Sequence, residues 1–192
     1  AEEAELLRLE NELRQERALI EAKTKVYDEI AAQVQPQTRR IQALCAEAEE
    51  PASFEPKLRE VCLLAAFVKR YSNLSLLAAD RSCLPAEELR LALEESLRQL
   101  RDMGIPALLD EERPEGEFSA RCMLHAYALF ELLLERALPG LQGVQCALRG
   151  GMLRLTLEGS VVRLPEDTGA ECEIEDGSSY LRIPLEKAGE TP

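Results

Sequence analysis

Several residue types that carry common chemistry are scarce in this chain of 192 residues. It has no tryptophan, a single histidine at position 125, and only two asparagines, Asn11 and Asn73. Zinc is usually held by several His and Cys ligands at close spacing. The six cysteines form no Cys-x-x-Cys pair, so the sequence predicts no metal site. We expect the cysteines to be reduced, buried thiols with a structural role.

Positive charge is also in short supply. The chain has 23 Lys and Arg residues against 36 Asp and Glu, a formal net charge of −13. Nucleic acids and anionic membrane surfaces bind clustered positive charge, so neither is an expected partner. No apolar run approaches the roughly 20 residues that span a bilayer, and no signal peptide is visible. We expect the chain to be cytoplasmic. If membrane helices precede it, it is the cytoplasmic part of a membrane sensor.

Hydrophobic residues, 46% of the chain, show a helical period at the beginning of the sequence. Between residues 2 and 48 they recur every seven positions, which predicts one long helix that supercoils with a partner helix as a coiled coil. One seam consists of Leu6, Leu13, Ile20, Tyr27, Val34 and Ile41. Pro36 removes a backbone hydrogen bond and predicts a kink near residues 32–36.

A second helix is predicted from Phe54 to Ala79, after a turn at residues 50–53 in which Ser53 is a candidate N-cap. Two helices joined by so short a turn form an antiparallel hairpin. Its apolar surface is too broad for a single copy to leave exposed. We therefore expect two copies to pair as a parallel homodimer with a four-helix bundle.

The rest of the sequence mixes helices and strands. Helices are predicted at 86–103 and 119–138, and strands at 105–109, 143–148, 152–158, 170–174 and 179–184. The predicted fold class is α+β, with a long helical hairpin followed by a small α/β sandwich whose helices pack on one face of a mixed sheet. We place the hairpin at residues 1–81 and the sandwich at 85–192.

This order of elements resembles a known family. The acidic pair Asp28-Glu29 directly follows Tyr27 on the first helix, and the helix segment 129–137 precedes strand-like runs at 145–148 and 153–157. The arrangement resembles the core of a sensor histidine kinase, which has a dimerisation and phosphoacceptor hairpin and an ATP-binding domain. The resemblance implies a two-component signal transduction module that forms homodimers and contacts a protein partner.

The positions that carry the chemistry in that family are changed here. The resemblance places Tyr27 and Asp28 where the family has its phosphoacceptor His and the following acid, and Glu135 where it has the Mg²⁺-binding Asn. The adenine-binding Asp-x-Gly-x-Gly motif is missing, and only residues 159–170 are available for a lid over ATP. We therefore expect no bound cofactor, no metal and no phosphotransfer, as in a pseudokinase in which these three positions are degenerate.

Other functions stay open at this level. One is an active, divergent sensor kinase with Tyr27 as the acceptor, and another is a coiled-coil adaptor. The run Asp167-Thr168-Gly169-Ala170 also matches the short aspartic-protease signature, but only 22 residues follow it, so we expect a turn. His125 is followed by Ala and belongs to the second domain, so a structural role is expected.

Overall fold

The computed structural model describes residues 2–47, 51–110, 112 and 115–187. Two long helices come first, α1 (Glu2–Ala46) and α2 (Pro51–Ala79). They are followed by β1 (Cys83–Pro85), α3 (Ala86–Asp102), β2 (Ala107–Leu109), β3 (Glu117–Ser119), α4 (Ala120–Ala137), β4 (Gly143–Arg149), β5 (Met152–Glu158), β6 (Glu171–Glu175) and β7 (Ser178–Pro184). The predicted α+β class, a helical hairpin followed by a small α/β sandwich, is confirmed.

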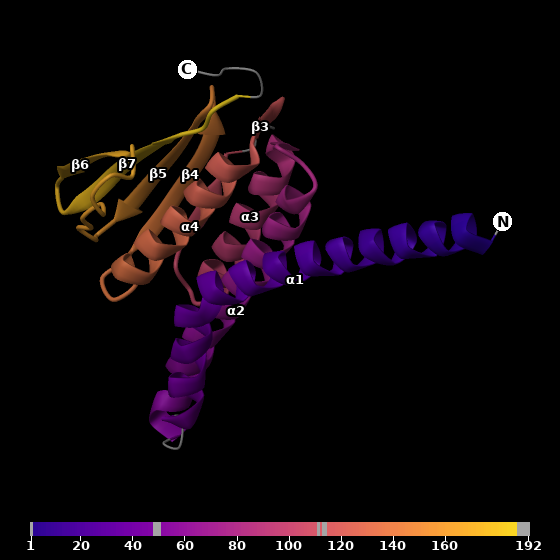
Figure 1. Cartoon of the computed structure of the whole chain (residues 1–192). Helices are drawn as coiled ribbons and strands as arrows, with labels where there is room; N and C mark the ends of the chain where they lie inside the picture. Colours follow the sequence, from indigo (N-terminus) through magenta and orange to yellow (C-terminus); the bar gives the residue numbers. More distant parts are fainter. Residues whose placement is uncertain (1, 48–50, 111, 113–114, 188–192) are drawn as a thin grey trace.

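Helix α1 has two parts with different surroundings. Its first part projects away from the rest of the molecule, and its last turns run beside α2 (Figure 1). The seam residues on the projecting part, from Leu6 to Tyr27, are each more than half exposed, whereas Val34 and Leu44 are buried. Pro36 lies inside the helix, which continues through it. The heptad pattern therefore has a partner within the chain only over its last turns.

Helix α2 begins earlier than the sequence predicted. It starts at Pro51, so residues 51–53 of the predicted turn are helical and Ser53 is not the N-cap, while residue 50 lies outside the described part. Among the described helices, the segment Phe54–Ala79 is long and apolar enough to cross a membrane. The expectation that no apolar run approaches this length was therefore wrong. Here it packs against α1, α3 and α4, and its Lys69 and Arg70 form ion pairs with α3.

The main sheet has five strands in the order β2-β4-β5-β7-β6. Strand β2 is parallel to β4, and the other neighbours are antiparallel, so the predicted mixed sheet is confirmed. The β6–β7 turn at Asp176 and Gly177 has positive φ at both residues, as a tight hairpin requires. A second sheet, formed by β1 and β3, was not predicted, because three-residue strands show no periodicity in a sequence.

Helices α3 and α4 pack on one face of the main sheet, and the core lies between them (Figure 1). The core includes Leu93 and Leu97 of α3, Phe130 and Leu134 of α4, and Leu153 of β5. The core also continues into the hairpin, where it includes Val34, Leu63, Phe67 and Leu74. The hairpin and the sandwich thus share one core, and the division at residues 81–85 stays a prediction.

The cysteines are less buried than expected. All six are free thiols, but only Cys146 is buried, and burial raises the pKa of its thiol to about 12. Cys45 and Cys62 are exposed, on α1 and α2, and the other three are half-buried. The prediction of buried thiols was wrong for these five.

Candidate functional site

Tyr27 and Glu135, the positions singled out on the two halves of the chain, lie apart. Tyr27 is on the projecting side of α1 and 58% exposed. The α1 residue that contacts Glu135 is Gln37, whose amide nitrogen donates a hydrogen bond of 3.2 Å to the Glu135 carboxylate. Ten residues of helix separate Tyr27 from Gln37, or about 15 Å. Asp28, next to Tyr27, is exposed as well.

The carboxyl group of Glu135 is partly covered by α1. Burial raises its pKa, and the hydrogen bond from Gln37 opposes this rise only in part. The side-chain oxygen of Gln37 is itself buried and has no hydrogen-bond partner among the described residues. This corner therefore combines an acid, whose pKa is above its ordinary value, with an unpaired amide oxygen.

The segment 159–170 between β5 and β6 makes two polar contacts with α4. Arg136 donates a hydrogen bond of 2.9 Å to the carbonyl oxygen of Arg163, and the His125 ring nitrogen Nε2 lies 3.3 Å from the carbonyl oxygen of Thr168. His125 and Arg136 are eleven residues apart, about three helical turns, so they lie on the same face of α4. The segment therefore contacts α4 near both ends of that face.

The sheet holds the same segment from the other side. The hydroxyl of Ser179 on β7 accepts a hydrogen bond of 3.0 Å from the Val162 amide and donates one of 3.0 Å to the carbonyl oxygen of Ser160. Val162 is buried. Gly159 opens the segment at φ +72°, and a Cβ there would come within 2.6 Å of the Gln142 side chain, so only glycine fits this position. These contacts with the sheet hold the first part of the segment, residues 159–162, in place.

The turn predicted at residues 167–170 is found at residues 166 and 167, where Asp167 adopts φ 59°. His125 is exposed, and its one polar contact in the described part is with Thr168. No group of three or more His, Cys, Asp or Glu side chains that could hold a metal ion is found among the described residues.

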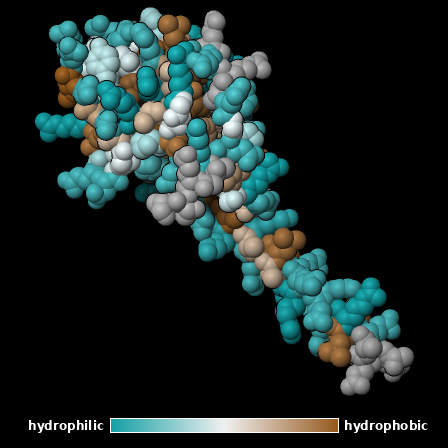
Figure 2. All heavy atoms as spheres, turned by 90° about the horizontal axis from the view of Figure 1, so that it is seen from above, coloured by the Kyte–Doolittle hydropathy of each residue, from teal (hydrophilic) through white to brown (hydrophobic). Residues whose placement is uncertain are grey.

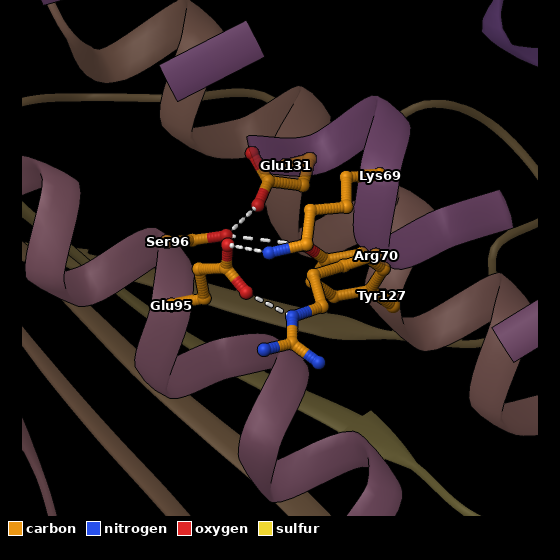
Figure 3. A network of polar contacts seen from close by, with 6 residues as sticks. All are labelled: Lys69, Arg70, Glu95, Ser96, Tyr127 and Glu131. Atoms are coloured by element: carbon orange, nitrogen blue, oxygen red, sulfur yellow. Dashed lines mark hydrogen bonds and ion pairs between the residues drawn. The ribbon is translucent and has the colours of Figure 1, made fainter. Parts of the chain in front are cut away.

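A polar network connects α2 to α3. Glu95 of α3 forms ion pairs with Lys69, at 2.9 Å, and with Arg70 (Figure 3). Burial alone would raise the pKa of Glu95, but the hydrogen bonds and charges of Lys69 and Arg70 outweigh burial and hold its pKa below the ordinary value. The hairpin is therefore attached to the sandwich by charge as well as by the shared core.

Deeper in the same network, α3 and α4 meet through three buried side chains. The hydroxyl of Ser96 donates a hydrogen bond to Glu131 and lies 3.1 Å from the Tyr127 hydroxyl (Figure 3). All three residues are at most 1% exposed. Burial raises the pKa of Glu131 from 4.5 to about 8, against the lowering by its hydrogen bonds with Ser96 and Tyr127. Glu131 is therefore a neutral acid at neutral pH.

Sequence reasoning missed Glu131 and Ser96. A signal was available, because Glu131 is the single charged residue in the apolar run Leu129–Leu134. An acid at a core-facing helix position is either strained or protonated. Ser96, however, lies 31 residues before Tyr127 and 35 residues before Glu131, and only the fold brings its hydroxyl to both side chains.

The comparisons with known proteins found similarity in structure only. No protein-family model matches the sequence, and no curated protein matches it significantly. A histidine kinase of Acinetobacter baumannii, AdeS, is similar with a TM-score of 0.41 and 13% identity, over 84% of this chain and 98% of the other. A bacterial phosphotransferase gives a TM-score of 0.42 at 10% identity, over 85% and 95% of the two chains.

The histidine kinase ThkA, solved in complex with the response regulator TrrA, gives a TM-score of 0.39 at 13% identity. It is matched over 93% of this chain and 65% of its own length. The similar structures thus include proteins of the class that the sequence resembles. Identities of 10–13% and TM-scores near 0.4 concern chain arrangement alone and assign no activity.

Proposed function

We propose that this chain is a histidine-kinase-like signal transduction module that forms a homodimer and does not transfer phosphate. The observation that carries the proposal is the segment 159–170, which lies on α4 where the family resemblance places the lid and the nucleotide. Hydrogen bonds from α4 and β7 hold the segment, and Val162 anchors it in the core. Binding a nucleotide between this segment and α4 would first require these contacts to break.

The charges around α4 also disfavour a triphosphate. Glu135 stands where the resemblance places a Mg²⁺-binding Asn, and Gln37 of α1 is bonded to it. The chain carries a net charge of −13, so phosphate groups approach it against long-range repulsion. These residues do not fit Mg-ATP, and we derive no phosphotransfer step through it.

The dimer is supported by the projecting part of α1. In the space-filling view this part carries hydrophobic side chains between hydrophilic ones, away from the rest of the molecule (Figure 2). Its seam residues Leu6, Leu13 and Ile20 are 62%, 52% and 57% exposed in a single chain. A parallel copy of the same helix has the same seven-residue period and would bury them. On α2, Phe54 and Leu58 are also exposed and are available to complete a four-helix bundle.

A module of this kind passes a signal through helix geometry. We propose that α1 transmits a change from an upstream segment to the sandwich and that a protein partner reads the result. The location we propose is the cytoplasm, either as a separate protein or as the cytoplasmic part of a membrane sensor. Fractionation of cells that express the protein tests this, because it separates a cytoplasmic protein from a membrane-bound one.

Mg-ATP is expected to leave the melting temperature unchanged at millimolar concentration. A ligand present at 100 times its dissociation constant would stabilise the fold by about 2.7 kcal/mol, which differential scanning fluorimetry detects easily. Glu135→Asn, which restores the family residue, is expected to give the same result, because segment 159–170 is still hydrogen-bonded to α4. A clear rise with Mg-ATP over Mg²⁺ alone, in the unaltered chain, would contradict the proposal.

Tyr27 is expected to take up no phosphate from labelled ATP. A phenol needs a base beside it to become a good nucleophile, and Asp28 lies about 100° round the helix from Tyr27, so Asp28 is poorly placed to act as that base. Tyr27→Phe is expected to leave the dimer intact. Tyr27→Ala is expected to weaken the dimer, because an aromatic ring is lost from the seam. Phosphate mapped to Tyr27 by mass spectrometry, and lost in the Phe variant, would establish an active kinase instead.

A further inference from the structure

A cleft of about 700 Å³ opens where α1 leaves the rest of the molecule. One wall is α1, with Val26, Glu29 and Ile30, and the opposite wall is the beginning of α4. The end of α2 and the residues after it close the third side. Pockets of 300–1,000 Å³ are typical of small-molecule sites. The cleft exists because many of the residues at this junction are small: Ala78, Ala79, Ala120 and Ala128.

The polar groups of the cleft carry a surplus of positive charge. Arg81 and Arg121 line it, and neither has an ion-pair partner among the described residues, while Glu29 is the one acid in the lining. Two arginines against one glutamate leave one net positive charge, in a chain whose total is −13. His125 lies in the same lining. The arginines can bind a carboxylate through two parallel hydrogen bonds.

The apolar part of the lining lies beside these charges. Val26 and Ile30 of α1 face the cleft together with Leu124 of α4, and the ring of Tyr71 adds an aromatic surface from α2. Burial raises the pKa of Tyr71, so its hydroxyl stays protonated and can donate a hydrogen bond. The cleft thus offers two charged donors, one neutral donor and an apolar surface.

We propose that this cleft binds a small organic carboxylate with one negative charge and an apolar body. The carboxylate lies between Arg81 and Arg121, and the body packs on the apolar residues of α1 and α4. The occupied cleft joins α1 to α2 and α4 at the point where α1 begins to project. A bound carboxylate therefore fixes the direction of the projecting part of α1 relative to the sandwich.

His125 provides a direct test, because it is the single histidine in the chain and lies in the cleft. Its ring signals are recorded by ¹H–¹³C NMR at constant pH while three carboxylates are added: indole-3-acetate, 4-phenylbutyrate and decanoate. The matching neutral amides serve as chemical controls. We expect at least one carboxylate to shift the His125 signals to saturation. Its amide is expected to bind at least about tenfold more weakly, because a charge-assisted hydrogen bond is lost.

Variants separate the cleft from surface charge in general. Arg81→Ser and Arg121→Ser are each expected to weaken binding about tenfold, with the fold checked by circular dichroism. Arg14→Ser removes an exposed arginine from the projecting part of α1 and is expected to leave binding unchanged. The proposal is overturned if no carboxylate in the panel shifts His125, if the amides bind equally well, or if Arg121→Ser binds like the unaltered chain. It does not depend on the absence of phosphotransfer.

Discussion

Glu131→Gln is expected to stabilise the fold at neutral pH by about 1–3 kcal/mol. The native state holds the Glu131 carboxyl protonated, because burial raises its pKa from 4.5 to about 8. Keeping a proton on a group that the unfolded chain has released costs about 1.4 kcal/mol per pKa unit, on the order of 3 kcal/mol at neutral pH. Glutamine has the same shape and no charge. The lower limit allows for an amide hydrogen that finds no acceptor beside Ser96 and Tyr127.

The pH dependence of this effect has a definite sign. Between pH 4.5 and about 8 the native state binds one proton more at Glu131 than the unfolded state does. The free energy of unfolding of the unaltered chain therefore contains a part that falls as pH rises through this window and is constant outside it. The glutamine variant lacks that part. The difference between the two unfolding free energies, measured by urea denaturation, is expected to grow with pH and to level off above about 8.

Glu95→Gln is the matched control, one residue before Ser96 in the same network. The pKa of Glu95 is held below its ordinary value, net of burial, by Lys69 and Arg70, so its charge stabilises the native state at neutral pH. Its replacement is therefore expected to lower the unfolding free energy, and the loss is expected to diminish as pH falls. Equal effects of the two substitutions, or a Glu131→Gln difference that does not change with pH, would show that Glu131 is ionised in the native state.

Ile20→Asp is expected to convert a homodimer into a monomer. Light scattering on the unaltered chain is expected to give about twice its mass of 21.4 kDa. In the dimer, Asp at position 20 would place two carboxylates in an apolar seam, and the uncompensated burial of a charge costs several kcal/mol. In one chain Ile20 is 57% exposed, so the substitution leaves the fold of the monomer intact. Ile30 is less useful, because it is already buried within the chain.

Ala18→Asp adds the same charge two residues earlier on α1. Position 18 lies about 200° round the helix from position 20 and outside the seam, so the dimer is expected to persist. Circular dichroism of both variants shows whether the helices remain. A single-chain mass for the unaltered protein at micromolar concentration would rule out the dimer, and a dimer that survives Ile20→Asp would place its interface elsewhere.

The periods of the hydrophobic pattern predicted most of the fold. The alternation in Met152–Glu158 gave both ends of β5, and the helical spacing after Pro85 gave α3 to within one residue. These elements are long and half-buried, so one face of each is recorded in the sequence. Short elements without such a face, β1 and β3, and the first turn of α2 were not recovered.

By itself, the sequence determined the α+β order of elements, the seven-residue seam of α1 and the residues at positions 27, 28 and 135. These features depend on neighbours along the chain, which periodicity and local propensity describe. Only the tertiary structure decided that segment 159–170 lies on α4, that Gln37 contacts Glu135 and that Glu131 meets Ser96. Each of these contacts joins residues far apart in the chain, and the pKa of a carboxyl group follows from burial and partners that only the folded chain provides.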